Sequence, residues 1–197
     1  MPDDILDLGP QARLVARVAE GITDEHLAAP TPCPAYAVRN LLGHVIGLAE
    51  AFRLAAHKEF GPTLDTSPGS LAPDVTPGWR GELPKALDAL AEAWRDPAAW
   101  QGMTRAGGID LPGEVAGLVA LDELVVHGWD LARATGQEYA PDEASLEAAR
   151  ALLTPTGEAD GESGGLFGEP VPVPDGAPLL DRVIGLSGRD PGWRAEG

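Results

Sequence analysis

The chain has 197 residues, which is enough for one well-cored domain but not for two of ordinary size. Its 31 acidic residues outnumber 14 basic ones, and the net charge of -17 argues against binding to nucleic acid or anionic membrane, since both need clustered cations. Because the chain has one cysteine, an acidic N-terminus and no apolar run near ~18 residues, we expect a soluble cytoplasmic protein.

The first predicted helix covers residues 5–20, where apolar residues recur at helical spacing until Gly21 ends the pattern. The prolines on both sides of Cys33 then interrupt the chain, because proline cannot donate to a helix and disfavours helical dihedrals in the residue before it. A second helix is predicted over residues 38–57. Residues 61–81 are rich in proline and glycine and are expected to form a long loop that covers one end of a bundle.

A third helix is predicted over residues 82–95, with leucines at helical spacing. After an irregular region that contains Gly107 and Gly108, a fourth helix is predicted over residues 113–135, followed by a shorter one over residues 142–153.

These patterns predict an all-α fold, a four-helix bundle with long connecting loops and a short C-terminal extension. We assign residues 1–153 to the helical bundle. Residues 154–197 are expected to form a Gly- and Pro-rich excursion, and then a short helix over residues 179–186 that docks back on the bundle.

The fourth predicted helix carries Glu123, His127 and Asp130 on one stripe. Side chains three and four residues apart lie above one another on a helix, with β-carbons about 5–6 Å apart, so one ion can contact more than one of them. Because burying an unpaired charge is costly, these groups must reach water, pair with one another or hold a cation. The simpler interpretation is a solvated Glu–His pair.

His44, on the edge of the apolar face of the second predicted helix, is the best candidate for a further ligand. A single histidine in such a place can equally be a hydrogen-bonded core residue. Two imidazoles and one carboxylate would leave coordination positions open, as in catalytic zinc sites and in iron or nickel sites. Asp130 is then a fourth ligand, a base, or a group that orients an imidazole, and the sequence leaves these three roles open.

Two glycines adjoin the histidines: Gly43 precedes His44 and Gly128 follows His127. Glycine inside a helix costs about 1 kcal/mol relative to alanine, so either a close approach around a site or tight packing must compensate. Cys33, just before the second helix, is either a small buried hydrophobe or a thiol whose pKa is lowered by the helix dipole.

Three segments of the chain resemble the metal-binding four-helix domain of mycothiol-dependent maleylpyruvate isomerase and its stand-alone relatives, within the DinB/YfiT-like group. They are residues 31–45, which begin Thr-Pro-Cys-Pro, residues 123–136 with the core His-Gly-Trp-Asp, and residues 178–191. The resemblance spans nearly the whole chain and implies a DinB-like four-helix bundle.

The resemblance also implies a divalent metal, usually zinc, held by His44, Glu123 and His127. Characterised relatives use the metal to bind and deprotonate a low-molecular-weight thiol such as mycothiol, which then attacks an electrophile. We therefore expect Zn2+, with Ni2+ or Fe2+ as alternatives, and a mycothiol-type thiol as cosubstrate of a transferase or isomerase that acts on an electrophilic small molecule. In this site Asp130 is the expected base or fourth ligand, and Arg39 the expected anchor for an anionic substrate.

The chain departs from the family pattern in two places. It has Ala35, Tyr36 and Ala37 where the family often has an acid, a tryptophan and an acidic helix cap, and its post-bundle segment is too short for the additional C-terminal domain of the isomerase. These departures argue against maleylpyruvate isomerisation itself. The alternatives are a non-catalytic metal- or ligand-binding domain and a metal-assisted hydrolase, and the sequence allows a homodimer.

Overall fold

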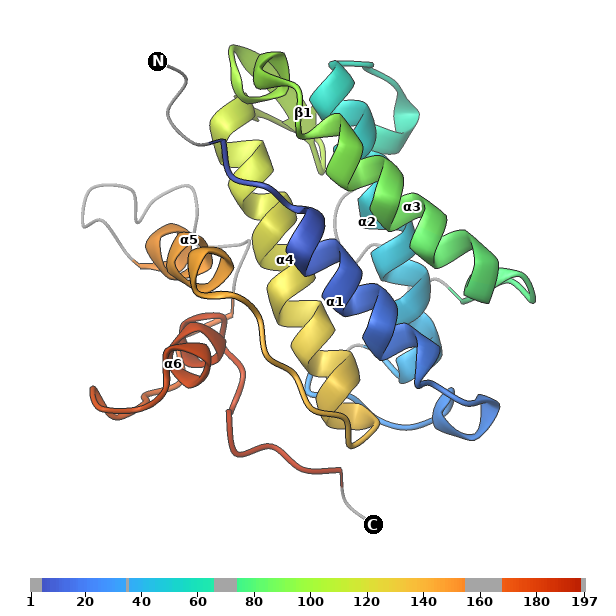
Figure 1. Cartoon of the computed structure of the whole chain (residues 1–197), viewed down its shortest axis with the longest axis vertical. Helices are drawn as coiled ribbons and strands as arrows, with labels where there is room; N and C mark the ends of the chain where they lie inside the picture. The colour runs from blue at the N-terminus through green and yellow to red at the C-terminus, as the bar shows by residue number, and fades with distance from the viewer. Residues whose placement is uncertain (1–4, 35, 66–73, 155–167, 196–197) are drawn as a thin grey trace.

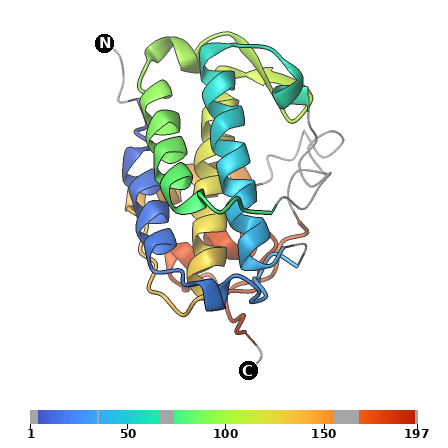
Figure 2. The same cartoon turned by 90° about the vertical axis from the view of Figure 1, so that its right-hand side faces the viewer.

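Four long helices form a bundle in the computed structural model, which describes residues 5–34, 36–65, 74–154 and 168–195 (Figure 1). They are α1 (Gly9–Glu20), α2 (Val38–His57), α3 (Trp79–Ala93) and α4 (Gly113–Ala134). Helices α1 and α2 each pack against both α3 and α4, so the four surround one apolar core (Figure 2). The predicted all-α fold is confirmed.

Shorter elements connect and flank the bundle. They are the 3-10 turns η1 (Asp24–His26), η2 (Pro62–Asp65) and η3 (Pro97–Trp100), the strands β1 (Met103–Ala106) and β2 (Ile109–Pro112), and the helices α5 (Glu143–Leu153) and α6 (Leu179–Leu186). Helix α5 packs against α4, and α6 packs against α5 (Figure 1). No helix within the described ranges combines the length and the apolar character that crossing a bilayer requires.

Helix α2 shows how the sequence builds the core. Leu41, Leu42, Val45 and Ala49 are fully buried at spacings of one, three and four residues, which places them on one side of the helix. Their partners come from the other three helices, and Val183 of α6 belongs to the same apolar cluster. The side of α2 that adjoins this stripe carries His44 toward α4.

The first helix begins four residues later than predicted, at Gly9 rather than at residue 5. Pro10 occupies its first turn, where a missing N–H costs nothing, and the Asp7 carboxylate accepts the Gly9 N–H at 2.8 Å. These local contacts fix the start, which the apolar period alone could not place.

The third helix begins three residues earlier than predicted, at Trp79, so Pro84 lies inside it. A proline there removes one helical hydrogen bond. Tertiary contacts compensate, because Trp79 is buried and the Arg80 guanidinium lies 4.2 Å above its ring while donating to the Ile22 carbonyl.

The region around Gly107 and Gly108 is a β-hairpin, not the irregular segment that we predicted. Strands β1 and β2 pair antiparallel with Thr104 opposite Leu111, and both glycines have positive φ, 60° and 80°, as a two-residue hairpin turn requires. The Thr104 hydroxyl donates to the Ala55 carbonyl at 2.6 Å, which ties the hairpin to the end of α2.

Two of the predicted loops lie partly outside the described residues, at 66–73 and 155–167. The described start of the first loop forms η2, and residues 168–178 of the second contain no helix or strand. The Val171 N–H donates to the Gly185 carbonyl at 2.9 Å, so this stretch runs along α6, the helix predicted for residues 179–186.

Candidate metal centre

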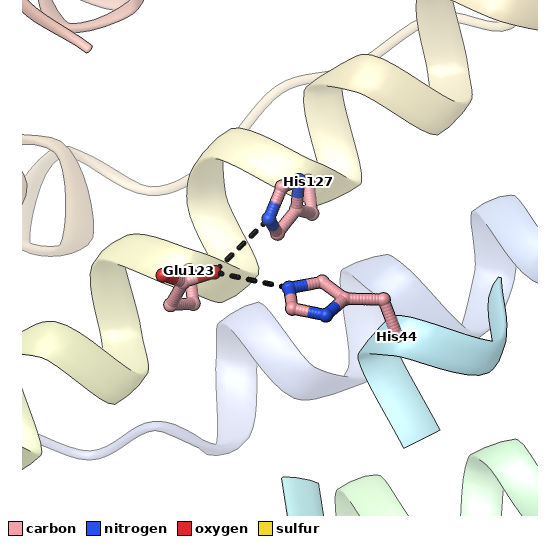
Figure 3. Close-up of side chains that lie close together, drawn as sticks. All are labelled: His44, Glu123 and His127. Carbon is pink, nitrogen blue, oxygen red and sulfur yellow. Dashed lines mark ion pairs between the residues drawn. The ribbon is translucent and has the colours of Figure 1, made fainter. Parts of the chain in front are cut away.

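Three side chains converge where α2 packs against α4: His44 from α2, and Glu123 and His127 from successive turns of α4 (Figure 3). One ligand atom from each lies within 4.8 Å of the other two. The same Glu123 oxygen, Oε2, is 3.0 Å from His127 Nε2 and 3.7 Å from His44 Nε2 (Figure 3). The structure therefore brings together the three residues that the sequence singled out on two separate helices.

The cluster is buried on one side and reaches solvent on the other. The side chain of His127 is only 7% exposed, whereas those of His44 and Glu123 retain 18% and 24% exposure. A small ion or ligand can therefore approach past His44 and Glu123.

Asp130 lies behind His127, on the side away from Glu123. Its carboxylate is fully buried, and its Oδ2 is 3.0 Å from His127 Nδ1. Histidines that bind metals usually donate their other ring N–H to such a carboxylate, which fixes the ring and its tautomer. Among the three roles left open by the sequence, this position favours the orienting one.

The electrostatics of the cluster follow from these short contacts. Burial alone would raise the pKa of Glu123, but hydrogen bonds from His127 and His44 outweigh it and hold that pKa far below its usual range. Burial alone would lower the pKa of His127, but its contacts with Asp130 and Glu123 raise it to about 9. The Glu123 carboxylate thus stays ionised beside the two imidazoles, and a cation between it and the histidines would complement that charge.

A further acid, Asp122, is 2% exposed on the same helix, and its Oδ1 has no hydrogen-bond partner among the described residues. Burial, reinforced by the neighbouring Glu123 charge, raises the pKa of Asp122 to about 8, while Arg189 and His127 act in the opposite direction. The cluster therefore lies beside two further buried acids of α4, Asp122 and Asp130.

Arg189, which the sequence did not single out, lies near the cluster. Arg39 is exposed in the first turn of α2, and no hydrogen bond or ion pair among the described residues joins its guanidinium to the cluster. Its role as a substrate anchor stays a prediction. Arg189, from the chain after α6, places Nη2 at 3.3 Å from Asp130 Oδ2. Sequence reasoning missed this residue, although it lies within the third segment that resembles the family.

Tyr36 is a second neighbour that sequence reasoning missed. Its ring stacks on His44 with centroids 5.2 Å apart, and His44 meets His127 edge-on at 4.9 Å. Burial raises the pKa of Tyr36, and negative charge at Cys33 and Glu123 raises it further. The half-buried Cys33 therefore also lies near the cluster, at the loop before α2.

Tight packing accounts for Gly128, one of the two glycines beside the histidines. A β-carbon at this position would collide with the hydroxyl of Tyr139 and contact Val15. That hydroxyl donates to the Val125 carbonyl at 2.9 Å and is also hydrogen-bonded to the buried Gln11 side chain, so it is not free to move away. At Gly128, the packing explanation is the one that the structure supports.

The donor set fits a divalent metal such as zinc. Two imidazole nitrogens and one carboxylate oxygen point toward a common centre, a ligand combination typical of catalytic zinc sites with open positions. The carboxylate behind His127 is the outer partner that such sites use.

Residues 8–132 match the family model described as the mycothiol maleylpyruvate isomerase N-terminal domain. Uncharacterized proteins from two strains of Mycobacterium tuberculosis are each 29% identical to this chain over 180 residues, covering 88% of this chain and 91% of their own length.

The solved structures of mycothiol-dependent maleylpyruvate isomerase and of its histidine-to-alanine mutant are also similar. Their TM-scores are 0.56 and 0.57 at 20% and 19% identity, over 75% of this chain and 67% of theirs. At that identity the likeness establishes the fold, and it confirms the predicted DinB-like helical bundle.

Proposed function

This chain belongs to the family of mycothiol maleylpyruvate isomerase N-terminal domains, and from this premise we propose that it is a divalent-metal-dependent enzyme that uses a mycothiol-type thiol. The reaction class is transfer or isomerisation, in which the thiol adds to an electrophilic small molecule. The observation that supports this proposal most is the convergence of His44, Glu123 and His127 at the solvent-accessible end of a buried charge network.

The three residues would hold Zn2+, with Ni2+ or Fe2+ as alternatives that suit the same ligands. When bound there, the ion supplies a positive charge that favours the thiolate form of a coordinating thiol at neutral pH. Asp130 keeps the His127 ring oriented, with Nε2 toward Glu123. Glu123 is the most exposed of the three, so the thiol proton can leave to solvent on that side of the cluster.

The surroundings of the cluster suit a small-molecule reaction. Tyr36 covers one face of His44 and so narrows the approach to the cluster. We further propose that the partners are the thiol and an electrophile. Nucleic acid and membrane have no role in this proposal, because the chain carries a net charge of -17. Whether two copies form a homodimer is decided by sedimentation of the purified chain.

One observation favours an alternative function, a metal- or ligand-binding domain without turnover. The chain has Ala35, Tyr36 and Ala37 where the family often has an acid, a tryptophan and an acidic helix cap. A domain of this kind would retain the metal and bind the thiol but would not convert electrophiles. A metal-assisted hydrolase would instead cleave ester substrates without added thiol.

Metal content of the protein purified without a histidine tag tests the proposed ligands. We expect about one divalent ion per chain for the wild type, as one three-residue site predicts, and none for His44→Ala or His127→Ala. His57→Ala is the matched control, because His57 is an exposed histidine of the same helix as His44 and should leave the metal content unchanged. Stoichiometric metal in either of the first two variants would contradict the assignment.

Thermal-shift measurements with mycothiol separate the thiol-dependent proposal from a hydrolase. The zinc-loaded wild type should melt at a higher temperature with the thiol, because a ligand that binds only the folded state stabilises it by RT ln(1 + [L]/Kd). His127→Ala should show no such shift. Thiol binding without conversion of any electrophile in a panel would favour the binding-domain alternative, and ester cleavage without thiol would favour the hydrolase.

A further inference from the structure

Arg189 reaches the metal centre from the far end of the sequence. It follows α6, its backbone N–H donates to the Ile184 carbonyl at 3.1 Å, and its Nη1 donates to the Ser187 carbonyl at 3.0 Å. Its Nη2 lies 3.3 Å from Asp130 Oδ2. The guanidinium is therefore held between its own segment and α4, with 17% of the side chain exposed.

The same oxygen of Asp130 accepts from two sides. Oδ2 contacts both His127 Nδ1, at 3.0 Å, and Arg189 Nη2, at 3.3 Å, while Oδ1 is buried without a hydrogen-bond partner among the described residues. Without Arg189, this carboxylate would keep a single donor. A buried carboxylate with one donor would turn or admit water, and the His127 ring would lose its fixed support.

Arg189 also provides a positive charge near the buried acids Asp122 and Asp130 of α4. Burial alone would lower its pKa, but nearby negative charge, with Asp130 first, raises it, so the guanidinium stays charged where it contacts Asp130. A buried carboxylate without a cation nearby is costly, because burial removes the water that would solvate its charge. The buried acids around the ligands therefore favour the position that Arg189 occupies in the folded chain.

We propose that Arg189 is a positioning residue of the metal centre, which holds Asp130 against His127 Nδ1 so that His127 presents Nε2 to the metal. This inference rests on the proposed function, because it assumes that the cluster binds a metal. The proposal makes the C-terminal segment part of the site, because Arg189 supports His127, a ligand that lies 62 residues earlier in the chain.

Zinc affinity tests the inference without any assay of turnover. In a competition with a chromophoric chelator, Arg189→Gln should bind zinc up to about 10-fold more weakly than the wild type, less than the 10- to 100-fold loss expected on removing the carboxylate that contacts the ligand itself. Arg194→Gln is the matched control, because Arg194 is an exposed arginine of the same segment whose hydrogen bonds, among the described residues, go to the Gly192 and Trp193 carbonyls. Its affinity should equal that of the wild type.

A spectroscopic readout and a double-mutant cycle separate positioning from general loss of structure. In the zinc-loaded protein, the Nδ1 proton of His127 should exchange with water faster in Arg189→Gln than in the wild type, as seen by nitrogen-15 NMR. In an Asp130→Asn background, Arg189→Gln should have little further effect on affinity, because the two residues act through one contact.

The outcomes distinguish the two proposals. If the wild type binds no zinc, the proposed function fails. If the wild type binds zinc and Arg189→Gln matches it in affinity and in proton exchange, only the role of Arg189 is refuted. Should Arg189→Gln fail to fold by circular dichroism, Arg189→Lys decides, because one ammonium cannot contact both Asp130 and the Ser187 carbonyl as the guanidinium does. Weaker zinc binding supports the inference, and wild-type values overturn it.

Discussion

His127 has a different carboxylate at each ring nitrogen, Glu123 at Nε2 and Asp130 at Nδ1. The spacing of these residues on a helix predicted that they share one stripe, but it did not predict which nitrogen faces which acid. That choice depends on the rotation of the ring, which the packing of α2 and of the C-terminal segment determines. The ligand candidates were thus readable from the sequence, while the position of Asp130 behind them was not.

Gly128 tests how closely the helix that carries His127 is packed. Gly128→Ala should lower the free energy of unfolding by about 1–3 kcal/mol, because the new methyl group meets the fixed hydroxyl of Tyr139, and this overpacking outweighs the better helix propensity of alanine. Urea unfolding of the metal-free protein measures the change.

Gly47 is the control for this substitution, because it lies inside α2 with nothing within 4 Å of an added β-carbon. Gly47→Ala should raise the free energy of unfolding by about 0.5–1 kcal/mol, since only the helix propensity changes. Equal effects of the two substitutions would show that Tyr139 moves aside and that Gly128 is not required for packing.

At the level of elements, apolar period and turn residues predicted the helices well but their starts less well. The bounds of α2, 38–57, agree with the prediction, whereas α3 begins earlier because Trp79 is buried and Arg80 contacts it. The hairpin was missed because each of its strands has only four residues and its alternation is weak, so Gly107 and Gly108 were the remaining signal.

The start of α2 lacks a side-chain cap, as its alanine led us to expect. Ala37 has the extended backbone of a cap residue, φ -73° and ψ 167°, but no side-chain acceptor, and only the Asn40 side chain accepts its N–H. Ala37→Ser should raise the free energy of unfolding by about 1 kcal/mol, because the hydroxyl can accept a free N–H of the first turn. Thermal unfolding measures this.

Removal of an existing cap, at the start of α5, is the control for this added cap. Asp142 already caps α5, with Oδ1 accepting the Ser145 N–H at 2.9 Å, so Asp142→Ala should lose about 1 kcal/mol. A loss of stability in Ala37→Ser would mean that the turn before α2 cannot accommodate the hydroxyl.

On the scale of the whole molecule, the C-terminal segment packs as part of the bundle. Leu146 and Leu153 of α5 and Val183 of α6 belong to the same apolar cluster as the four long helices, and Arg133 of α4 donates to the Pro191 carbonyl. The domain boundary predicted at residue 154 stays a prediction. The apolar core contains residues from both sides of it.

This continuity predicts that the bundle and the C-terminal segment unfold together. Urea unfolding followed by circular dichroism and by tryptophan fluorescence should give coincident transitions, and the amides of α6 (Leu179–Leu186) should be protected from hydrogen exchange nearly as well as those of α5. Two separate transitions, or rapid exchange confined to α6, would contradict it and would make the segment an independent unit.

The sequence by itself determined the helices of the bundle and the pairing of Glu123 with His127, because both depend on the period of a helix, which brings side chains three and four residues apart onto one face. His44, on another helix, was joined to them as the best further candidate and by the family resemblance. Only the tertiary structure showed that Arg189 contacts Asp130, that Tyr36 stacks on His44 and that the Asp130 carboxylate faces His127 Nδ1. These contacts join segments distant in the chain or depend on how a side chain is turned. Packing determines both, and no local period encodes them.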